Sequence, residues 1–402
     1  MPSKICNANS NRLRGCKKKL YPTKEQKSLI DRNIEVSRAV YNIALEIQIK
    51  NRDDGNKFIQ YYDMCSIISK LRNDDPKYQW LNDVSIGVIR EALLDLDNAF
   101  MKFFNKINRF PKFKSKKSKK SFTTRSDRTR IKGSKIQLSG LSKELINAKK
   151  HQIPSDIPIH NPTVTYDGND YWFSCTYERD PIDMSNKEKT DIIGIDVGIR
   201  NMITTSNGQF FHLPDTSKLE NRLKRAQRRL QKDYDKYSNE AKRTRTKYEN
   251  VPKSKNHLKR LEKQRKIYKK ISNIRKNAIH NATKTIVENN PKGIVIENIK
   301  VNQIIYDNPW MKKYKPQMMF CEIHKQLQYK AQDRDIPVYQ APRNFKSTQT
   351  CSICGNEHKV TPGMKVFKCP FCHFEIDRDL NAAINLQYLV QDSNVREIYQ
   401  IS

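Results

Sequence analysis

The stretch Ile192-Ile-Gly-Ile-Asp-Val-Gly198 is a short apolar run that ends in a carboxylate. A run of this length and composition predicts a buried strand. The same pattern returns in Gly293-Ile-Val-Ile-Glu297, and Ile336-Pro-Val-Tyr339 predicts a third strand. A carboxylate at the end of a buried strand costs free energy unless it meets a cation or hydrogen-bond donors. Asp196 and Glu297 are therefore the first candidate functional residues.

A third acid, Asp379, opens the segment Asp379-Leu-Asn-Ala-Ala-Ile-Asn-Leu386, which predicts a helix. Three carboxylates that converge from separate elements would hold hard divalent ions. Two such ions, about 3.5–4 Å apart, activate a water and stabilise the leaving oxygen in phosphodiester hydrolysis. Taken singly, each acid is more often a surface residue or a helix cap, and Asp377 is the alternative to Asp379.

Four cysteines have the spacing C-x2-C-x14-C-x2-C, which is typical of a zinc ribbon in a reducing compartment. Each pair can direct two thiolates at one ion, and two pairs close a tetrahedron that leaves no position for water. We therefore expect one structural zinc ion. Its predicted ligands are Cys351, Cys354, Cys369 and Cys372. His358 and His373 lie nearby, but four sulfurs already satisfy the ion.

The charge balance predicts a polyanionic partner. The 402 residues include 77 Lys+Arg and 43 Asp+Glu, a formal net charge of +34. The apolar stretches are too short to span a bilayer and no signal-peptide pattern precedes them, so nucleic acid is favoured over a membrane. The excess is concentrated in residues 111–135, with eleven Lys/Arg and one acid, and in residues 222–284, with 23 Lys/Arg and five acids.

Both basic segments have a second interpretation. Residues 111–135 could be a solvated, disordered tail, although Phe113 and Phe122 among the cations favour a nucleic-acid groove. Residues 222–284 predict two long helices. In the second helix an apolar stripe predicts core packing, and the basic faces around it remain available to phosphates. The stripe consists of Leu258, Leu261, Tyr268, Ile271, Ala278 and Ala282.

The remaining sequence divides into recognisable parts. Thr23 and Gln26 form a capping-box pattern before an apolar periodic run, and residues 23–105 predict a helical bundle. The alternation over 163–177, with Asp-Gly in its middle, predicts a β-hairpin. The polar, turn-rich residues 180–190 mark a domain boundary.

Several of these motifs, in this order, resemble the TnpB family, the RNA-guided nucleases of insertion-sequence transposons. Eukaryotic and viral Fanzors and type V CRISPR effectors are similar in the same segments. The motifs are Lys19-Leu-Tyr-Pro-Thr-Lys-Glu-Gln26, Ser37-Arg-Ala-Val-Tyr-Asn-Ile-Ala-Leu45, Pro111-Lys-Phe-Lys114, Gly194-Ile-Asp-Val-Gly-Ile-Arg-Asn-Met-Ile-Thr-Thr205, Arg275-Lys-Asn-Ala-Ile-His280, Ile294-Val-Ile-Glu-Asn-Ile299, Cys351-Ser-Ile-Cys-Gly355, Cys369-Pro-Phe-Cys372 and Asp377-Arg-Asp-Leu-Asn-Ala-Ala383. Departures from the family pattern are His373 where Gly is frequent, Asn298 for Asp and Lys365 for Arg, and none removes a metal ligand.

The resemblance implies an α+β multidomain fold. It implies an RNase H-like RuvC nuclease domain with an inserted zinc ribbon, an N-terminal wedge-like β-barrel and a helical recognition lobe. In this sequence the expected ranges are 1–22 and 106–182 for the barrel, 23–105 for the recognition helices, 190–349 and 374–402 for the RuvC domain, and 350–373 for the zinc ribbon. Asp196, Glu297 and Asp379 would then bind two catalytic Mg²⁺ ions.

The function implied is RNA-guided cutting of double-stranded DNA next to a short target-adjacent motif. The implied partners are a structured guide RNA of the omega RNA type, the target DNA and its displaced strand, and we expect one copy of the chain to act with its RNA. The expected location is the prokaryotic cytoplasm at the nucleoid, or the nucleus in a eukaryotic or viral host. The nucleic-acid contacts predicted by position are Tyr41, Asn42, Lys112, Lys114, Lys116, Arg225, Arg228, Arg229 and Arg275.

Alternative functions follow from the same residues. A nuclease-dead relative would be an RNA-guided repressor, which would have lost one of the three carboxylates, and all three are present. A transposase proper would use similar metal chemistry, and a zinc-ribbon nucleic-acid-binding protein would use the acids only structurally. The sequence leaves open the host, the guide, the adjacent motif and its reading residues, the cleavage pattern, and the choice among transposon, Fanzor and CRISPR contexts.

Overall fold

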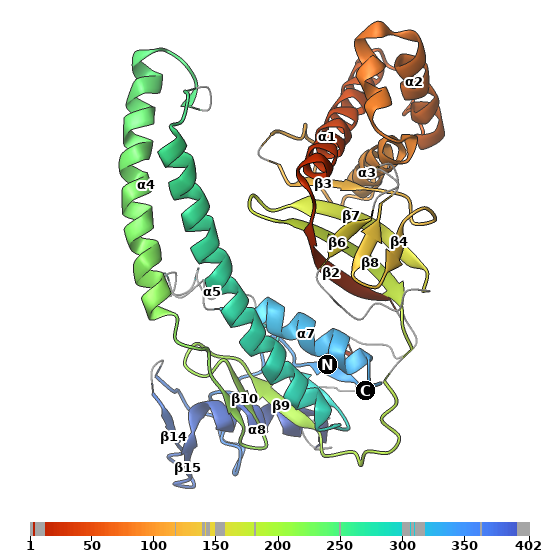
Figure 1. The fold of residues 1–402 in the computed structure, drawn as a ribbon. Coiled ribbons are helices and arrows are strands. Elements are labelled where there is room, and N and C mark those ends of the chain that lie inside the picture. Colours follow the sequence, from red (N-terminus) through yellow and green to blue (C-terminus); the bar gives the residue numbers. More distant parts are fainter. Residues whose placement is uncertain are drawn as a thin grey trace. The chain divides into compact units, whose positions relative to one another are not determined.

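The chain folds into two compact units, residues 12–179 and residues 1–11 together with 180–402 (Figure 1). Both contain helices and strands, so the α+β multidomain class is confirmed. The computed structural model describes residues 3–4, 13–116, 118–138, 141, 145–148, 157–180, 182–248, 251–299, 306, 309, 318–361 and 364–391. Parts of the predicted segments 1–22, 106–182, 190–349 and 374–402 lie outside these residues. Among the described helices, none has the length and apolarity that a membrane span requires.

The helical part of unit 12–179 matches the bundle predicted for residues 23–105. Its helices are α1 (Lys24–Asp53), α2 (Tyr61–Asp74), the 3-10 helix η1 (Pro76–Asp83) and α3 (Ile86–Phe104). The capping box is present: Thr23 Oγ1 accepts from the backbone N–H of Gln26 at 3.2 Å, and Gln26 Oε1 accepts from the backbone N–H of Thr23 at 3.1 Å. The apolar faces share one core that includes Val40, Leu45, Leu81 and Leu93.

The same unit contains a seven-stranded antiparallel sheet in the order β3-β7-β8-β2-β6-β5-β4. The strands are β2 (Leu13–Tyr21), β3 (Lys120–Thr123), β4 (Arg130–Lys132), β5 (Lys135–Gln137), β6 (Ile146–Ala148), β7 (Ile159–Tyr166) and β8 (Tyr171–Glu178). The predicted hairpin is confirmed: β7 and β8 pair with Tyr166 opposite Tyr171, and Gly168 takes a φ of 92° in the turn. Phe122, Val164 and Phe173 lie in its core.

The second unit is built on a six-stranded sheet in the order β1-β13-β12-β9-β10-β11. The strands are β1 (Ser3–Lys4), β9 (Ile193–Asp196), β10 (Ile203–Thr205), β11 (Phe210–Phe211), β12 (Ile294–Ile296) and β13 (Val338–Gln340). The three predicted strands are therefore confirmed, and β12 runs parallel to both β9 and β13.

Two predicted boundaries are corrected in this sheet. The prediction assigns residues 1–11 to the N-terminal barrel, but β1 pairs with β13, where it supplies backbone partners to an otherwise open strand edge. The prediction also starts the third strand at Ile336, but β13 begins at Val338. Pro337 has no backbone N–H to donate to a ladder, which accounts for the later start.

Helices cover both faces of this sheet. They are α5 (Lys255–Glu288), α7 (Phe320–Gln332) and α8 (Arg378–Gln391), while α4 (Ser217–Arg243) packs on α5. Ile294 and Ile296 pack with residues of α5 and α7, such as Ile286 and Leu327. Val295 points to the opposite face and packs with Leu386 and Leu389 of α8. Successive side chains of a strand point to opposite faces of the sheet, and here both faces are covered by helices. The side chains of β12 are therefore apolar at every position, which explains the continuous apolar run of this strand in the sequence.

Gly194 in β9 lets α8 approach the sheet closely. A Cβ placed on Gly194 would lie 2.0 Å from the backbone oxygen of Ala383 and 2.5 Å from the backbone nitrogen of Gln387. Both atoms belong to the α8 backbone and cannot turn aside as a flexible side chain could. The absence of a side chain at position 194 thus sets how close Asp379, at the start of α8, lies to Asp196.

Gly194→Ala is expected to destabilise the second unit by more than the roughly 1–3 kcal/mol typical of overpacking, because a whole helix must move. Thermal unfolding followed by circular dichroism measures the effect. Gly15→Ala is the matched control, since Gly15 lies in strand β2, where an added Cβ would have nothing within 4 Å and the backbone φ is not positive. A Gly194→Ala protein that melts with the parent would contradict the close approach.

Candidate functional site

Three carboxylates from distant parts of the chain lie at one edge of the second unit's sheet. Ile195 of β9 is the parallel partner of Ile296 in β12, so Asp196 and Glu297, the residues that follow them, are neighbours at the carboxyl ends of the strands. Asp379 lies in the first turn of α8, which packs on β9. Its Oδ2 atom is 4.0 Å from the position of a Cβ on Gly198. The three acids predicted from the sequence are therefore brought together.

Two of the three carboxylates are buried, Glu297 is partly buried, and the three carry unfavourable charge. Asp196 is 6% exposed and Asp379 is 5% exposed. Burial, followed by the charges of Glu297 and Asp379, raises the pKa of Asp196 well above its usual value. Burial also raises the pKa of Glu297, opposed by a hydrogen bond from Ser347 and reinforced by Asp379. Buried oxygens that repel one another are the donor set that a hard divalent cation satisfies best.

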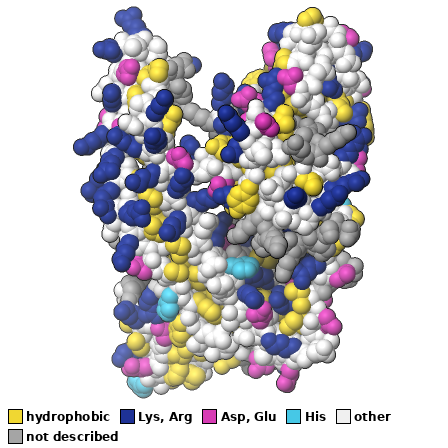
Figure 2. Space-filling view, in the orientation of Figure 1, with side chains coloured by type: hydrophobic (Ala, Val, Ile, Leu, Met, Phe, Trp, Pro, Cys, Tyr) yellow, Lys and Arg dark blue, Asp and Glu magenta, His cyan; other side chains and the backbone are white. Residues whose placement is uncertain are grey.

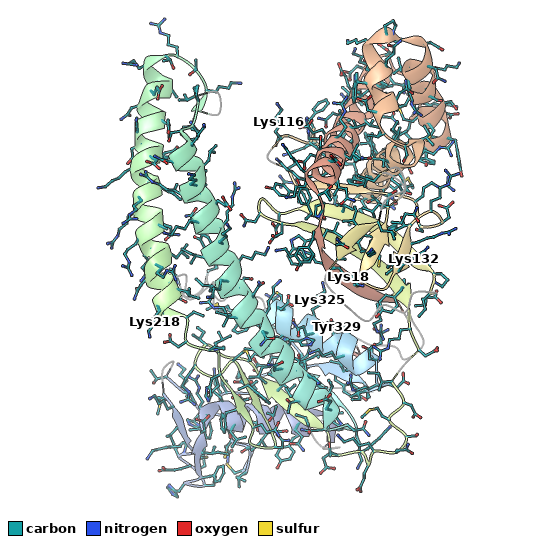
Figure 3. The ribbon with its side chains drawn as sticks, in the orientation of Figure 1. Lys18, Lys116, Lys132, Lys218, Lys325 and Tyr329 are labelled. Carbon is teal, nitrogen blue, oxygen red and sulfur yellow. The ribbon has the colours of Figure 1, made fainter. Side chains whose placement is uncertain are left out.

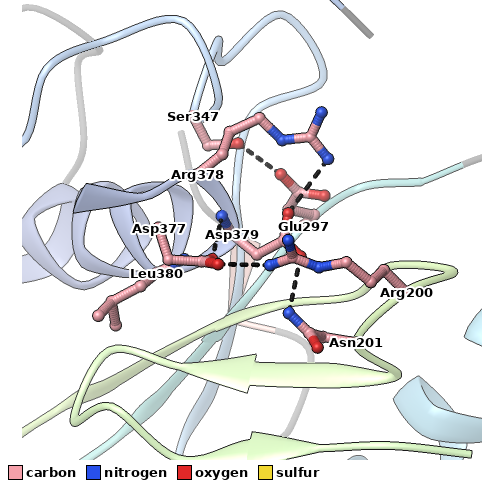
Figure 4. Close-up of polar contacts among 8 residues, drawn as sticks. All are labelled: Arg200, Asn201, Glu297, Ser347, Asp377, Arg378, Asp379 and Leu380. Carbon is pink, nitrogen blue, oxygen red and sulfur yellow. Dashed lines mark hydrogen bonds and ion pairs between the residues drawn. The ribbon is translucent and has the colours of Figure 1, made fainter. Parts of the chain in front are cut away.

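Asp379 is held by donors on two sides (Figure 4). Asn201 Nδ2 donates to its Oδ2 at 3.0 Å, and an Arg378 guanidinium nitrogen donates to its Oδ1 at 3.1 Å. An Arg200 nitrogen lies 3.5 Å from Oδ2 in an ion pair and also pairs with Asp377. Two guanidinium groups therefore supply positive charge at the edge of the cluster.

Asp377, the alternative to Asp379, has a different role. Its Oδ1 accepts the backbone N–H groups of Asp379 at 2.9 Å and Leu380 at 3.3 Å. Asp377 thus satisfies free N–H groups at the start of α8, as a capping carboxylate does. This leaves Asp379 as the carboxylate that joins Asp196 and Glu297.

Glu297 is oriented by a segment that leads into the cysteine cluster. Ser347 Oγ donates to Glu297 Oε1. The backbone oxygens of Ser347 and Thr350 accept from Asn385 Nδ2 at 2.8 Å and 2.7 Å. Asn381 donates to Thr350 O at 2.7 Å and accepts from the Ser352 N–H at 3.0 Å. Two buried asparagines of α8 therefore fix residues 347–352 beside the carboxylates.

The sequence interpretation did not identify Asn201, Ser347, Asn381 or Asn385 as site residues. A signal was available for two of them, because Asn381 and Asn385 are four residues apart in an otherwise apolar helix. Polar side chains buried on one helix face need partners. Asn201 and Ser347 have no such local signal, since their partners are 178 and 50 residues away.

The four cysteines form a group of potential ligands for a single metal ion, with all four sulfurs within 4.8 Å of one another. Cys351 Sγ lies 3.7 Å from Cys372 Sγ, and Cys354 Sγ lies 3.5 Å from Cys369 Sγ. Bonds of about 2.3 Å to a central zinc place sulfurs roughly 3.8 Å apart, so the arrangement fits zinc. The backbone N–H of Asn356 is the largest cause that lowers the pKa of Cys354, to about 6.

The two halves of the cysteine ribbon have the same turn. The backbone N–H of Gly355 donates to Cys351 O, and that of His373 donates to Cys369 O, each at 3.0 Å. Both residues have left-handed backbones, with φ of 73° at Gly355 and 57° at His373. This conformation costs a residue with a Cβ roughly 1–2 kcal/mol, which gives a physical reason for Gly at this position in the family pattern. Strands β14 (Val366–Lys368) and β15 (Glu375–Asp377) pair with each other, and β15 leads directly into α8.

The predicted nucleic-acid contacts on α4 are available at the surface. Arg225, Arg228 and Arg229 are all exposed. Figure 2 shows Lys and Arg side chains gathered along α4, and Figure 3 shows sticks projecting outward from both long helices. The far tip of the α4–α5 pair is fixed by Lys253, whose ammonium group lies 3.7 Å from the ring centre of Tyr248 and 4.4 Å from that of Tyr237. The basic surface therefore stands on a packed helical hairpin.

Arg275, in contrast, is not available to a phosphate. It is 7% exposed, and its guanidinium donates to Glu220 Oε1 at 2.6 Å and to Thr216 Oγ1 at 3.4 Å. This interaction joins α5 to the start of α4. The assignment of Arg275 to nucleic-acid binding is therefore corrected to a structural ion pair.

Of the nucleic-acid contacts predicted in unit 12–179, some are likewise exposed and others are held by contacts within the protein. Lys112 and Lys116 are exposed, and Figure 3 labels Lys116 on the segment before β3. Asn42 donates to Lys114 O at 3.0 Å and accepts from the Lys114 N–H at 2.8 Å. Tyr41 is 5% exposed, with the Lys114 ammonium 3.9 Å from its ring centre. Asn42 thus fixes the backbone of residue 114 and Tyr41 contacts its ammonium group, whereas Lys112 and Lys116 remain able to face a ligand.

Three family models match successive parts of the chain. Residues 10–57 match a model described as a helix-turn-helix domain of the OrfB IS605 type, residues 173–305 match the OrfB IS605 model described as "Probable transposase", and residues 320–386 match the model described as "Cas12f1-like, TNB domain". The described part of the first match contains β2 and α1. The third match contains Cys351, Cys354, Cys369, Cys372 and Asp379.

Two curated proteins are similar over most of the chain. The first is the Escherichia coli K12 protein named "Putative RNA-guided DNA endonuclease InsQ", which is 26% identical over 93% of this chain and 92% of its own length. The second is a Streptomyces pristinaespiralis protein named "Putative RNA-guided DNA endonuclease". It is 26% identical over 93% of this chain and 88% of its own length.

Solved structures with similarity to the chain include two CRISPR effectors. A Cas12f1–sgRNA–target DNA complex matches with a TM-score of 0.48 and 13% identity, over 93% of this chain and 98% of that one. CasPhi-2 (Cas12j) bound to crRNA matches with a TM-score of 0.48 and 10% identity, over 94% of this chain and 98% of that one.

Proposed function

We propose that this chain is a member of the TnpB family and an RNA-guided DNA endonuclease that cuts double-stranded DNA. The observation that carries the proposal is the convergence of Asp196, Glu297 and Asp379 at the carboxyl ends of β9 and β12, beside a four-cysteine ribbon. The RNA-guided DNA endonuclease description of the two curated relatives supports it. The strongly basic α4 surface supports a nucleic-acid partner.

Asp196, Glu297 and Asp379 would hold two Mg²⁺ ions, and the buried, mutually repelling carboxylates fit such ions. When bound, the ions would lower the pKa of a water and stabilise the leaving oxygen during phosphodiester hydrolysis. Asn201 and Ser347 orient the Asp379 and Glu297 carboxylates. Arg200 and Arg378 lie at the rim, where a guanidinium can attract the phosphate that is to be cut.

The mixed sheet of the second unit, with helices on both faces and carboxylates at the strand ends, supports an RNase H-like RuvC domain over residues 190–349 and 374–402. Residues 350–373 would be a zinc ribbon inserted in it, with one structural Zn²⁺. Residues 23–105 would form the recognition lobe, and the seven-stranded sheet would form the wedge-like barrel with residues 12–22 and 106–182. The proposed site assignments retain Lys112, Lys116, Arg225, Arg228 and Arg229 for nucleic acid.

The guide would be a structured RNA of the omega RNA type, with double-stranded DNA and its displaced strand as the other partners. Base pairing would read the target, while the protein would read a short adjacent motif. An RNA-guided binder without cutting is the alternative. It would need a missing carboxylate, and Asp196, Glu297 and Asp379 are all present.

Purified with Mg²⁺ and the RNA transcribed from the DNA that flanks its gene, the protein is expected to cut DNA that matches the guide. Cutting is measured on labelled linear DNA, with a scrambled guide segment and EDTA as controls. Guided binding without cutting would favour the repressor alternative. Cutting that ignores the guide sequence would contradict the proposal.

A further inference from the structure

Helices α4 and α5 enclose a small pocket whose lining is almost entirely cationic. The pocket has a volume of about 180 Å³, and two apolar residues, Ala226 and Ile267, complete its lining. Its charged lining residues are Arg222, Arg225, Arg229, Arg260 and Lys263. Among the described residues, no acid lines it. Because all of these residues lie within one unit and on two packed helices, the pocket belongs to a fixed part of the molecule.

One pocket cation is held in position by the protein itself. Arg260 donates to Asp233 Oδ1 at 2.6 Å, and Asp233 Oδ2 also contacts His257 Nδ1 at 3.1 Å. By contrast, Arg222, Arg229 and Lys263 have neither a hydrogen bond nor an ion pair in the described part of the chain. Like charges in one pocket repel one another, so an anion bound beside the three cations without partners would relieve their repulsion.

We propose that this pocket binds a backbone phosphate of the guide RNA. Guanidinium groups present paired N–H donors that match phosphate oxygens, and three of the pocket cations surround the site without partners among the described residues. An RNA strand is favoured over a free phosphate because exposed cations continue along α4 beyond the pocket, as a chain of phosphates requires (Figure 2). The inference rests on the proposed function, since it assigns one contact of the guide.

Two exposed arginines of α4 provide a matched test. Arg229 lines the pocket, whereas Arg243, in the last turn of the helix, does not line it and is not among the proposed nucleic-acid contacts. Affinity for the RNA transcribed from the flanking DNA is measured by filter binding at several salt concentrations. Arg229→Ala is expected to weaken binding about tenfold or more and to lower the slope of log K against log salt by about 1, because one phosphate contact is lost. Arg243→Ala is expected to change the slope much less.

A double charge reversal extends the comparison. Arg222→Glu with Arg229→Glu reverses two pocket positions, and Lys236→Glu with Arg243→Glu reverses two exposed positions of α4 that do not line the pocket. Net charge changes equally in both, so a larger loss for the pocket pair supports the proposal. Circular dichroism melting confirms that each variant is folded.

The outcomes separate this inference from the proposed function. If the pocket and control variants had equal slopes of log K against log salt, the proposed phosphate site would be wrong, whereas the proposed guided cutting would be unaffected. A parent protein that does not bind the RNA would overturn the proposed function and the inference together. Binding of inorganic diphosphate tests whether the pocket takes a free phosphate anion instead of an RNA backbone phosphate. If the pocket variants lose diphosphate binding, measured by calorimetry, but keep parental RNA affinity, the pocket is a small-anion site and the proposal is wrong.

Discussion

Asp196→Asn is expected to lower the rate of DNA cutting by at least about 10²-fold, the loss that follows removal of one preorganised electrostatic group. Guide binding should remain near the parental value, because Asp196 lies at the carboxylate cluster and not on the basic face of α4. The rate is measured with saturating guide RNA and Mg²⁺ on matched DNA. A variant that cuts as fast as the parent would remove Asp196 from the catalytic set.

The same substitution is expected to stabilise the metal-free protein. Burial and the neighbouring acids raise the pKa of Asp196 in the folded state, so its charged form is less favourable in the folded than in the unfolded state. The parent therefore loses stability as pH rises above about 4, the pKa of an unfolded Asp, toward the folded pKa. Asp196→Asn does not carry this charge. At pH 7 in EDTA, the melting temperature of the variant should exceed that of the parent. Addition of Mg²⁺ should raise the melting temperature of the variant less than it raises that of the parent.

Asp377→Asn is the matched control for both measurements. It alters an aspartate two residues from Asp379 that caps α8 and pairs with Arg200. Asn caps a helix about as well as Asp, so this variant loses only the partly exposed ion pair with Arg200 and should melt at or slightly below the parent in EDTA. If Asp377→Asn were more stable and Asp196→Asn less stable than the parent, the roles given to the two aspartates would be reversed.

Removal of zinc is expected to unfold the cysteine ribbon and to stop cutting. The ribbon has two short strands and one small core around Phe367, which cannot fold residues 351–377 without the ion. Structural zinc binds zinc-finger peptides with an apparent free energy of about 10–16 kcal/mol, and that binding is their folding energy. Because Asn381 and Asn385 fix residues 347–352 next to Glu297, the disorder would reach Ser347 and its carboxylate partner.

Mass spectrometry of the native protein should find one zinc per chain, and Cys369→Ser should lose it. Hydrogen exchange should then rise over the ribbon while the α4–α5 hairpin stays protected. Cys321→Ser is the control, since Cys321 is an exposed free thiol on α7 outside the cysteine cluster. A ribbon that stays protected after chelation would show that zinc does not hold it.

Local features of the fold were predictable because their causes are local. The capping box at Thr23, the Asp-Gly hairpin and the apolar strands all follow from residues within a few positions of each other. The cysteine spacing and the three acids were also identified, since each stands out against its own neighbours. That Asp379, and not Asp377, joins the cluster depended on the resemblance to a family.

Features that depend on which face is buried were not predictable from charge or spacing alone. In α5 the predicted stripe includes Leu258 and Tyr268, but they are 54% and 47% exposed. Ile271 and Ala282 of the predicted stripe are buried, but the buried face also contains Ile267, Ile279 and Ile286, which the stripe omits. The sequence interpretation places Arg275 on the basic surface, yet Glu220 of α4 pairs with it inside. Only the packing of one helix against another decides such cases.

The order of the carboxylates along the chain has a consequence for synthesis. Asp196 and Asp379 are 183 residues apart, and the sheet edge that carries Asp196 and Glu297 is complete only when β13 and α8 have emerged. At about 5–20 residues per second, roughly 10–40 s pass between the translation of the first acid and the third. Unit 12–179 is continuous and can fold during that time. A ribosome therefore releases the basic surfaces well before it releases a complete set of cutting groups, and a nascent chain can bind RNA before it can cleave DNA.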